Sequence, residues 1–136
     1  MAHGWKILIA EDDEDLAQAY RRLLPARMAD CDVDVVPDGS NALVLYGEKE
    51  HDLVVTDINM PGLNGRDLFR ETRQMCRERD HRMPLFLFTS GVQSALDGVD
   101  DLCDGIQADT LLKPYTFRTL QQTIESMLAD DEDGAT

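Results

Sequence analysis

The chain is short of positive charge and has no long hydrophobic run. Its 136 residues include 27 acidic and 13 basic side chains, which gives a formal net charge of −14. This acidity disfavours nucleic-acid binding, because phosphate backbones attract basic surfaces. No apolar stretch approaches the roughly 20 residues of a membrane-spanning helix, and the N-terminus has no signal-peptide pattern. The sequence therefore predicts a cytoplasmic protein with neither nucleic acid nor membrane as a partner.

Cysteine and histidine patterns that hold metals or form disulfide frameworks are also absent. Cys31, Cys76 and Cys103 are an odd number of widely spaced residues without a CxxC motif. We expect them to be reduced, partly buried thiols. The three histidines show no ligand spacing, so no chemistry is assigned to them.

What the sequence does contain is an alternation of short apolar runs and helical patterns. With 136 residues, 43% of them hydrophobic, the chain is long enough for one domain with a core. Apolar runs bounded by turn signals predict buried parallel strands. The runs lie at residues 6–10, 33–36, 52–56, 84–88 and 110–112, and the helical patterns at about 14–28, 40–48, 66–79, 95–102 and 116–128.

This order predicts an α/β fold, a (βα)5 doubly wound flavodoxin-like parallel sheet with strand order 2-1-3-4-5. We expect a single domain over residues 1–129 and an acidic tail over 130–136, solvated and frayed. Gly98 weakens the fourth helical pattern. In the third, arginines at helical spacing predict a solvated basic face, formed by Arg66, Arg70, Arg73 and Arg77.

Polar residues follow four of the five predicted strands. Glu11 and Asp12 follow the first strand, Asp57 the third, Thr89 the fourth and Lys113 the fifth. Because ligand chemistry collects at the carboxyl ends of parallel strands, we expect these side chains to share one cleft. Neighbouring strands lie about 4.8 Å apart, which puts Lys113 roughly 10 Å from Asp57 at the backbone. Only a long side chain closes that gap.

This set of side chains suits a Mg²⁺-dependent phosphoacceptor. Carboxylates at neighbouring strand ends repel one another, and a hard divalent cation with oxygen ligands relieves the repulsion. Asp57 can then act as an oxygen nucleophile that forms an aspartyl phosphate. The Lys113 ammonium and the Thr89 hydroxyl can neutralise and hold the phosphoryl oxygens.

Four segments of the chain resemble the receiver domain of the two-component response-regulator family. They are residues 7–13, 52–65, 85–90 and 111–115, and the likeness covers about 6–128. The resemblance implies a receiver that takes a phosphoryl group from a sensor histidine kinase or a histidine phosphotransfer protein. It then signals through an unidentified downstream protein. It implies no enzyme beyond self-catalysed phosphotransfer and autodephosphorylation.

The resemblance also implies a role for each acidic residue. Asp57 matches the phosphorylated aspartate, and Glu11 with Asp12 matches the acidic pair that binds Mg²⁺. Asp12 is expected to bind the metal directly and Glu11 through water. Asn59 matches the position whose backbone carbonyl also binds the metal.

The remaining matches concern the phosphoryl oxygens. Thr89 matches the switch hydroxyl, Ser90 the small residue behind it, and Lys113 the lysine that pairs with the phosphate. The resemblance makes Lys113–Pro114 a candidate cis peptide.

One position departs from the family pattern. Thr110 stands where the family usually has an aromatic ring that turns inward on activation, and Tyr115 matches a different, buried aromatic position. The phosphate site is thus predicted intact while its readout is altered. We expect activation to act on residues 90–105 instead.

Three other interpretations fit parts of the sequence. The chain could be a receiver excised from, or relaying within, a larger phosphorelay protein, although the ends at Met1 and Thr136 favour a stand-alone receiver. A haloacid-dehalogenase-type phosphatase needs a second aspartate two residues after the nucleophile, and Asn59 cannot transfer a proton. A flavin protein needs a phosphate-cradling loop after the first strand, where the acidic residues here repel phosphate.

Overall fold

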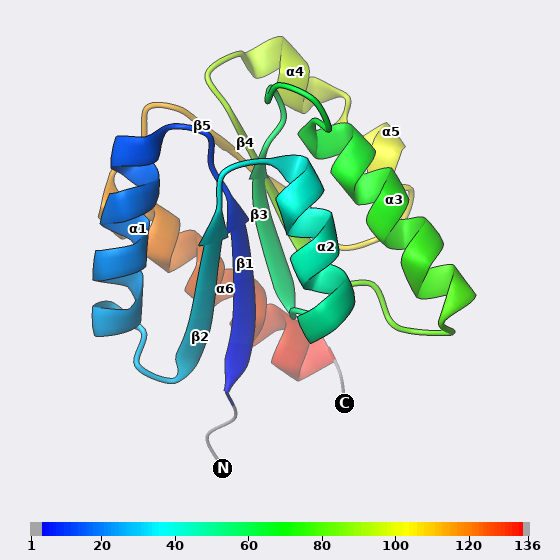
Figure 1. Ribbon diagram of the computed structural model, residues 1–136, viewed down its shortest axis with the longest axis horizontal. Coiled ribbons are helices and arrows are strands. Elements are labelled where there is room, and N and C mark those ends of the chain that lie inside the picture. Colours follow the sequence, from blue (N-terminus) through cyan, green and yellow to red (C-terminus); the bar gives the residue numbers. More distant parts are fainter. Residues whose placement is uncertain (1–3, 135–136) are drawn as a thin grey trace.

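Five parallel strands form one sheet with helices on both faces (Figure 1). The computed structural model describes residues 4–134. The strand order is β2-β1-β3-β4-β5, which confirms the predicted topology. The strands are β1 (Trp5–Ala10), β2 (Cys31–Val36), β3 (Leu53–Asp57), β4 (Leu85–Ser90) and β5 (Ala108–Leu112). The helices are α1 (Glu14–Arg27), α2 (Gly39–Lys49), α3 (Gly65–Glu78), α4 (Gln93–Asp97), α5 (Val99–Cys103) and α6 (Phe117–Gly134).

The two faces of the sheet carry separate apolar cores. Alternate residues of a strand point to opposite faces, so Leu8 and Val54 join the core beneath α2 and α3. Ile7 and Val55 join the core beneath α1 and α6. With both faces covered, the central strands are buried along their length, and every residue of β3 is buried. In residues 4–134, no helix is long and apolar enough to cross a membrane.

The fourth helical pattern is two short helices rather than one. α4 ends at Asp97 and α5 begins at Val99, with Gly98 between them. Leu96 and Val99 are buried, as the apolar spacing predicts. The break follows from the low helix propensity of glycine.

The expected frayed tail over 130–136 is helical as far as Gly134, so that expectation was wrong for 130–134, while 135–136 lie outside the described residues. Asp131 is only 9% exposed and forms an ion pair with Arg82, at the loop before β4. This ion pair joins the last part of α6 to the loop before β4.

The predicted solvated basic face of α3 is also only partly correct. Arg66 donates a hydrogen bond to the Ala95 carbonyl at 2.6 Å, and Arg73 reaches the Leu102 carbonyl at 3.5 Å. The Arg73 guanidinium lies 5.4 Å from the centre of the Phe69 ring. Two of the four arginines therefore hold α4 and α5 against α3.

Candidate functional site

The acidic pair lies where β1 passes into α1. Asp13 is the N-cap of α1, and its carboxylate accepts the Leu16 backbone N–H at 3.2 Å. Glu11 is 3% exposed and accepts the Asp13 backbone N–H at 3.1 Å. Asp12, between them, is exposed. The cap thus turns the chain so that one carboxylate is buried at the strand end and the next faces solvent.

Asp57 is the last residue of β3 and is 6% exposed. The sheet register pairs it with Thr89 of β4, whose hydroxyl donates a hydrogen bond to the Asp57 carboxylate. Gly65 packs against the backbone here, because a Cβ atom on it would lie 2.4 Å from the Asp57 carbonyl oxygen. The loop that ends at Gly65 is therefore pressed against the base of Asp57.

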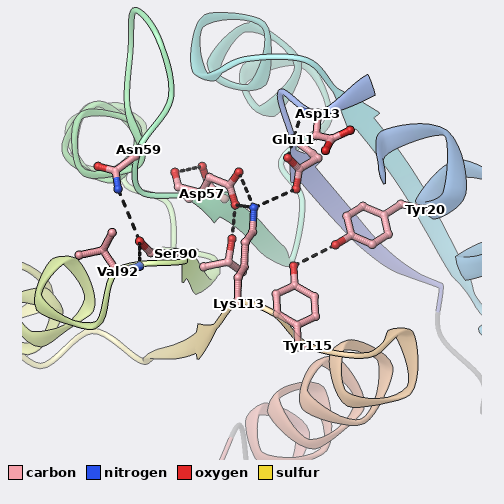
Figure 2. A network of polar contacts seen from close by, with 11 residues as sticks. Glu11, Asp13, Tyr20, Asp57, Asn59, Ser90, Val92, Lys113 and Tyr115 are labelled. Carbon is pink, nitrogen blue, oxygen red and sulfur yellow. Dashed lines mark hydrogen bonds and ion pairs between the residues drawn. The ribbon is translucent and has the colours of Figure 1, made fainter. Parts of the chain in front are cut away.

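Lys113 reaches the same carboxylate from β5, two strands away, as its length predicted. Its backbone N–H donates to the Ser90 carbonyl at 2.8 Å. Its Nζ lies 2.9 and 3.0 Å from the two Asp57 oxygens and 3.6 Å from Glu11 Oε1 (Figure 2). The Lys113–Pro114 peptide bond is cis, which confirms that prediction.

The site holds more negative than positive charge. Carboxylate oxygens of Glu11, Asp12 and Asp57 lie within 4.8 Å of one another. In the described part of the chain this is the one group of three such side chains that could share a metal ion. Burial and the neighbouring Asp57 carboxylate raise the pKa of Glu11 to about 7. Three carboxylates face a single ammonium group, so the site has excess negative charge and several oxygen donors. Mg²⁺ prefers such a site.

Lys113 keeps its proton in this setting. Burial lowers its pKa, but the hydrogen bond and the charge of Asp57, with that of Glu11, outweigh burial and raise it overall. The ammonium is therefore fixed beside the carboxylate that it pairs with.

Asn59 and Ser90 lie at the rim of the site. Asn59 is exposed, and its amide nitrogen lies 3.5 Å from the Ser90 hydroxyl. The same hydroxyl accepts the Val92 backbone N–H at 3.0 Å. Ser90 thus connects the loop after β3 to the start of α4 (Figure 2). The structure brings all of the predicted site residues to one edge of the sheet; their roles stay predictions.

Sequence reasoning missed a pair of tyrosines beside Lys113. The hydroxyls of Tyr20, on α1, and Tyr115, just after β5, lie 2.9 Å apart. Tyr20 falls on the apolar stripe of its helix and reads as a core residue. Because the two positions are 95 apart in the sequence, no local spacing signals the contact.

Comparison with known proteins gives a family for this chain. The model of the response regulator receiver domain matches residues 7–125. The chain is 33% identical over 124 residues to the two-component response regulator PhoP of Pseudomonas aeruginosa, covering 90% of this chain and 51% of PhoP. It is 30% identical to the regulatory protein VanRB of Enterococcus faecalis, covering 90% and 52%. The chain thus spans about half the length of these relatives.

Solved structures agree in fold. The receiver domain of the hybrid histidine kinase CckA is 26% identical with a TM-score of 0.70, over 90% of this chain and 98% of that domain. The receiver domain of the sensor histidine kinase PA1611 from Pseudomonas aeruginosa is 24% identical, with a TM-score of 0.70 and coverage of 93% and 98%. That structure has a magnesium ion coordinated in its active site cleft.

The fold, the acidic pocket and these matches agree. The match to the receiver-domain model excludes the phosphatase and flavin-protein interpretations, because it spans the strand ends that carry Glu11, Asp57 and Thr89. A receiver works with a histidine kinase in two-component signalling and is not a classical enzyme. The chain therefore belongs to the response regulator receiver domain family.

Proposed function

We propose that Asp57 accepts a phosphoryl group from a phosphohistidine. The observation that carries this proposal is the setting of its carboxylate, which lies between the Thr89 hydroxyl and the Lys113 ammonium with two further carboxylates beside it. No other described carboxylate combines a cation, a hydroxyl donor and a potential metal site.

In this step an Asp57 oxygen forms a bond to phosphorus as the phosphorus–nitrogen bond of the donor breaks. The bonding electron pair returns to the imidazole nitrogen, which leaves as neutral histidine when its other nitrogen carries the proton. Lys113 offsets charge on the transferring oxygens, and Thr89 donates a hydrogen bond to one of them. The chain's own contribution is therefore positioning and charge neutralisation.

Mg²⁺ is the metal that the donor set fits. When bound, it offsets the charge of the carboxylates and of the phosphoryl oxygens. Asp12 and Asp57 would hold it directly, Glu11 through water, and Asn59 through its backbone carbonyl. The exposure of Asp12 and the burial of Glu11 support this division, since the exposed carboxylate is free to turn toward an ion.

The partners follow from the same proposal. The donor is a sensor histidine kinase or a histidine phosphotransfer protein, both of which act in the cytoplasm. The output is a phosphorylation-dependent contact with a downstream protein. A second form of the proposal is a receiver that belongs to, or relays within, a longer protein. It is supported by the relatives, which are about twice as long as this chain.

Incubation with acetyl phosphate and Mg²⁺ tests the phosphoacceptor. We expect the intact protein to gain the mass of one phosphoryl group, and Asp57→Asn to gain none, because the amide is not a nucleophile for phosphorus. The control is Asp101→Asn, which removes one exposed carboxylate remote from the site and should be labelled like the wild type. Full labelling of Asp57→Asn would show that another residue is the acceptor.

A further inference from the structure

We propose that the Tyr20–Tyr115 hydroxyl pair positions Lys113 and thereby sets the rate at which Asp57 is phosphorylated, an inference that rests on the function proposed above. The two tyrosines are positioning residues, because they act through the lysine rather than on the phosphoryl group. Tyr115 lies in one of the four segments that carry the resemblance, whereas Tyr20 lies outside all of them.

The pair joins the loop that carries Lys113 to a helix on the far side of the site. Tyr20 is 3% exposed on α1, and Tyr115 lies between β5 and α6, two residues after Lys113. Their hydroxyls meet at 2.9 Å, and Figure 2 shows the two rings converging beside the lysine. Because Pro114 alone separates Lys113 from Tyr115, a shift of the tyrosine moves the lysine backbone.

The loop at Lys113 is anchored on both sides, and the lysine side chain must span a long distance. Its N–H is fixed to the Ser90 carbonyl at 2.8 Å on the β4 side. On the α1 side, the tyrosine pair anchors the loop. From there Nζ reaches both oxygens of Asp57, at 2.9 and 3.0 Å. Small displacements at the base of such a long side chain become large ones at its tip.

The loop that carries Tyr115 borders an open groove. A groove of about 290 Å³ lies between α1 and the start of α6, lined by the two tyrosines together with Leu16, Leu23, Pro114 and Phe117. Tyr115 packs on one side against the core beneath α1 and α6, while the groove leaves its other side open. Without the hydrogen bond, Tyr115 and the lysine behind it have room to move into the groove.

The position of Lys113 matters for the rate of transfer. With acetyl phosphate as donor, an Asp57 oxygen bonds to phosphorus while the phosphorus–oxygen bond to acetate breaks, and acetate leaves with the electron pair. The ammonium offsets charge on the transferring oxygens during this exchange. Misplacement of a charge-stabilising group lowers the rate at saturating donor more than it lowers donor affinity.

Removing either hydroxyl tests the pair from both sides. We expect Tyr115→Phe and Tyr20→Phe each to lower the rate of Asp57 phosphorylation at saturating acetyl phosphate by about threefold to tenfold. The double variant should lose no more than the stronger single variant, because both changes break the same bond. Half-saturating donor concentration should change less than the rate.

A matched control separates positioning from a loss of stability. Tyr46 is as buried as Tyr20, and its hydroxyl lies 3.2 Å from the Cys76 sulfur in the other core, remote from the site. Tyr46→Phe should therefore keep the wild-type rate. NMR of the lysine side chain, assigned with Lys113→Ala, gives a readout independent of activity. The Lys113 Nζ signal should shift in Tyr20→Phe and Tyr115→Phe and stay in place in Tyr46→Phe.

The outcomes distinguish the two proposals. Unchanged rates in both phenylalanine variants, or slower rates with an unmoved Lys113 signal, would overturn the positioning role. A wild-type protein that gains no phosphoryl group on Asp57 would overturn the proposed function, while the NMR signal would still report whether the tyrosines hold the lysine.

Discussion

The hydroxyl of Thr89 donates to the Asp57 carboxylate in this structure, so its side chain already points to the place where a phosphoryl group would be added. When a phosphoryl group bonds to Asp57, the carboxylate loses its charge, and the charged phosphoryl oxygens become the stronger hydrogen-bond acceptors. We therefore expect Thr89 to move its bond to a phosphoryl oxygen with little change of its own. The larger response falls to the residues after it, beginning with Ser90.

At this scale the first prediction concerns Mg²⁺. A lost direct ligand should weaken binding more than a lost water-mediated one, for which roughly 10- to 100-fold is typical. We expect Asp12→Ala and Asp57→Ala to lower the affinity more than 100-fold and Glu11→Ala less, as measured by NMR titration. Asp15→Ala removes an exposed carboxylate of α1 and controls for net charge. A larger loss at Glu11 than at Asp12 contradicts the assignment.

The element best placed to respond is the pair of short helices α4 and α5. Each has five residues, and neither has a side-chain hydrogen bond at its N-cap. Helices this short have little stability of their own, so the arginines of α3 contribute to holding them. Arg66 bonds to the Ala95 carbonyl and also lies against Gly98, where a Cβ atom would come within 3.4 Å of its guanidinium.

A path of contacts joins this element to the site. Ser90 directly follows Thr89, and its hydroxyl accepts the Val92 N–H at the start of α4. On the β5 side, Thr110 pairs with Phe88 in the sheet. A β-branched side chain there is stiff and has no ring to rotate inward. The loosely held helices are thus the element with two accessible arrangements.

The prediction at this scale uses amide hydrogen exchange. With beryllofluoride as a phosphoryl mimic and Mg²⁺, protection should change most at residues 90–105 and least at 110–117, because the first segment has weak helices and the second begins with a paired strand. Asp57→Asn, which lacks the anchoring carboxylate, should show neither change. Protection changes centred on 110–117, with 90–105 unaffected, would contradict the proposal that α4 and α5 respond to phosphorylation.

For the whole molecule, the sequence predicted whatever depends on short-range pattern. Strand order and the gathering of Asp57, Thr89 and Lys113 followed from apolar runs and from the rule that parallel strands end at one edge. The low helix propensity of glycine alone indicated a weak point at Gly98, where the helix is broken. Contacts between polar side chains far apart in the sequence, such as Arg82 with Asp131, were not predicted. Tertiary packing decides which residues meet, and no local sequence pattern marks them.

His51 is another long-range contact of this kind, and it links stability to pH. Its side chain is buried beneath the edge strand β2, where Nε2 lies 2.9 Å from an Asp34 oxygen. Lys49 also contacts Asp34, at 2.7 Å, and the two partners outweigh burial and lower the pKa of that carboxyl. The other ring nitrogen, Nδ1, has no hydrogen-bond partner among the described residues. Neutral histidine fits this site, with its Nε2–H donating to the carboxylate.

Protonation of His51 should therefore destabilise the fold. Burial lowers the pKa of His51 below its ordinary 6.5, despite the Asp34 carboxylate. Below about pH 6.5, His51 therefore binds a proton more readily in the unfolded chain than in the folded protein. The contribution of His51 to stability is present above that pH and is lost as pH falls. Glu11, with a raised pKa, contributes in the opposite direction below about pH 7.

Urea unfolding of the wild type and of His51→Gln at pH 7.5 and 5.5 measures the contribution of His51. Both proteins contain Glu11, so its contribution cancels when their changes in unfolding free energy are compared. The free energy of unfolding should fall more on acidification in the wild type than in His51→Gln, whose amide keeps a donor for Asp34 but cannot take up a proton. Equal falls in the two proteins would show that His51 accepts its proton in the folded state without cost.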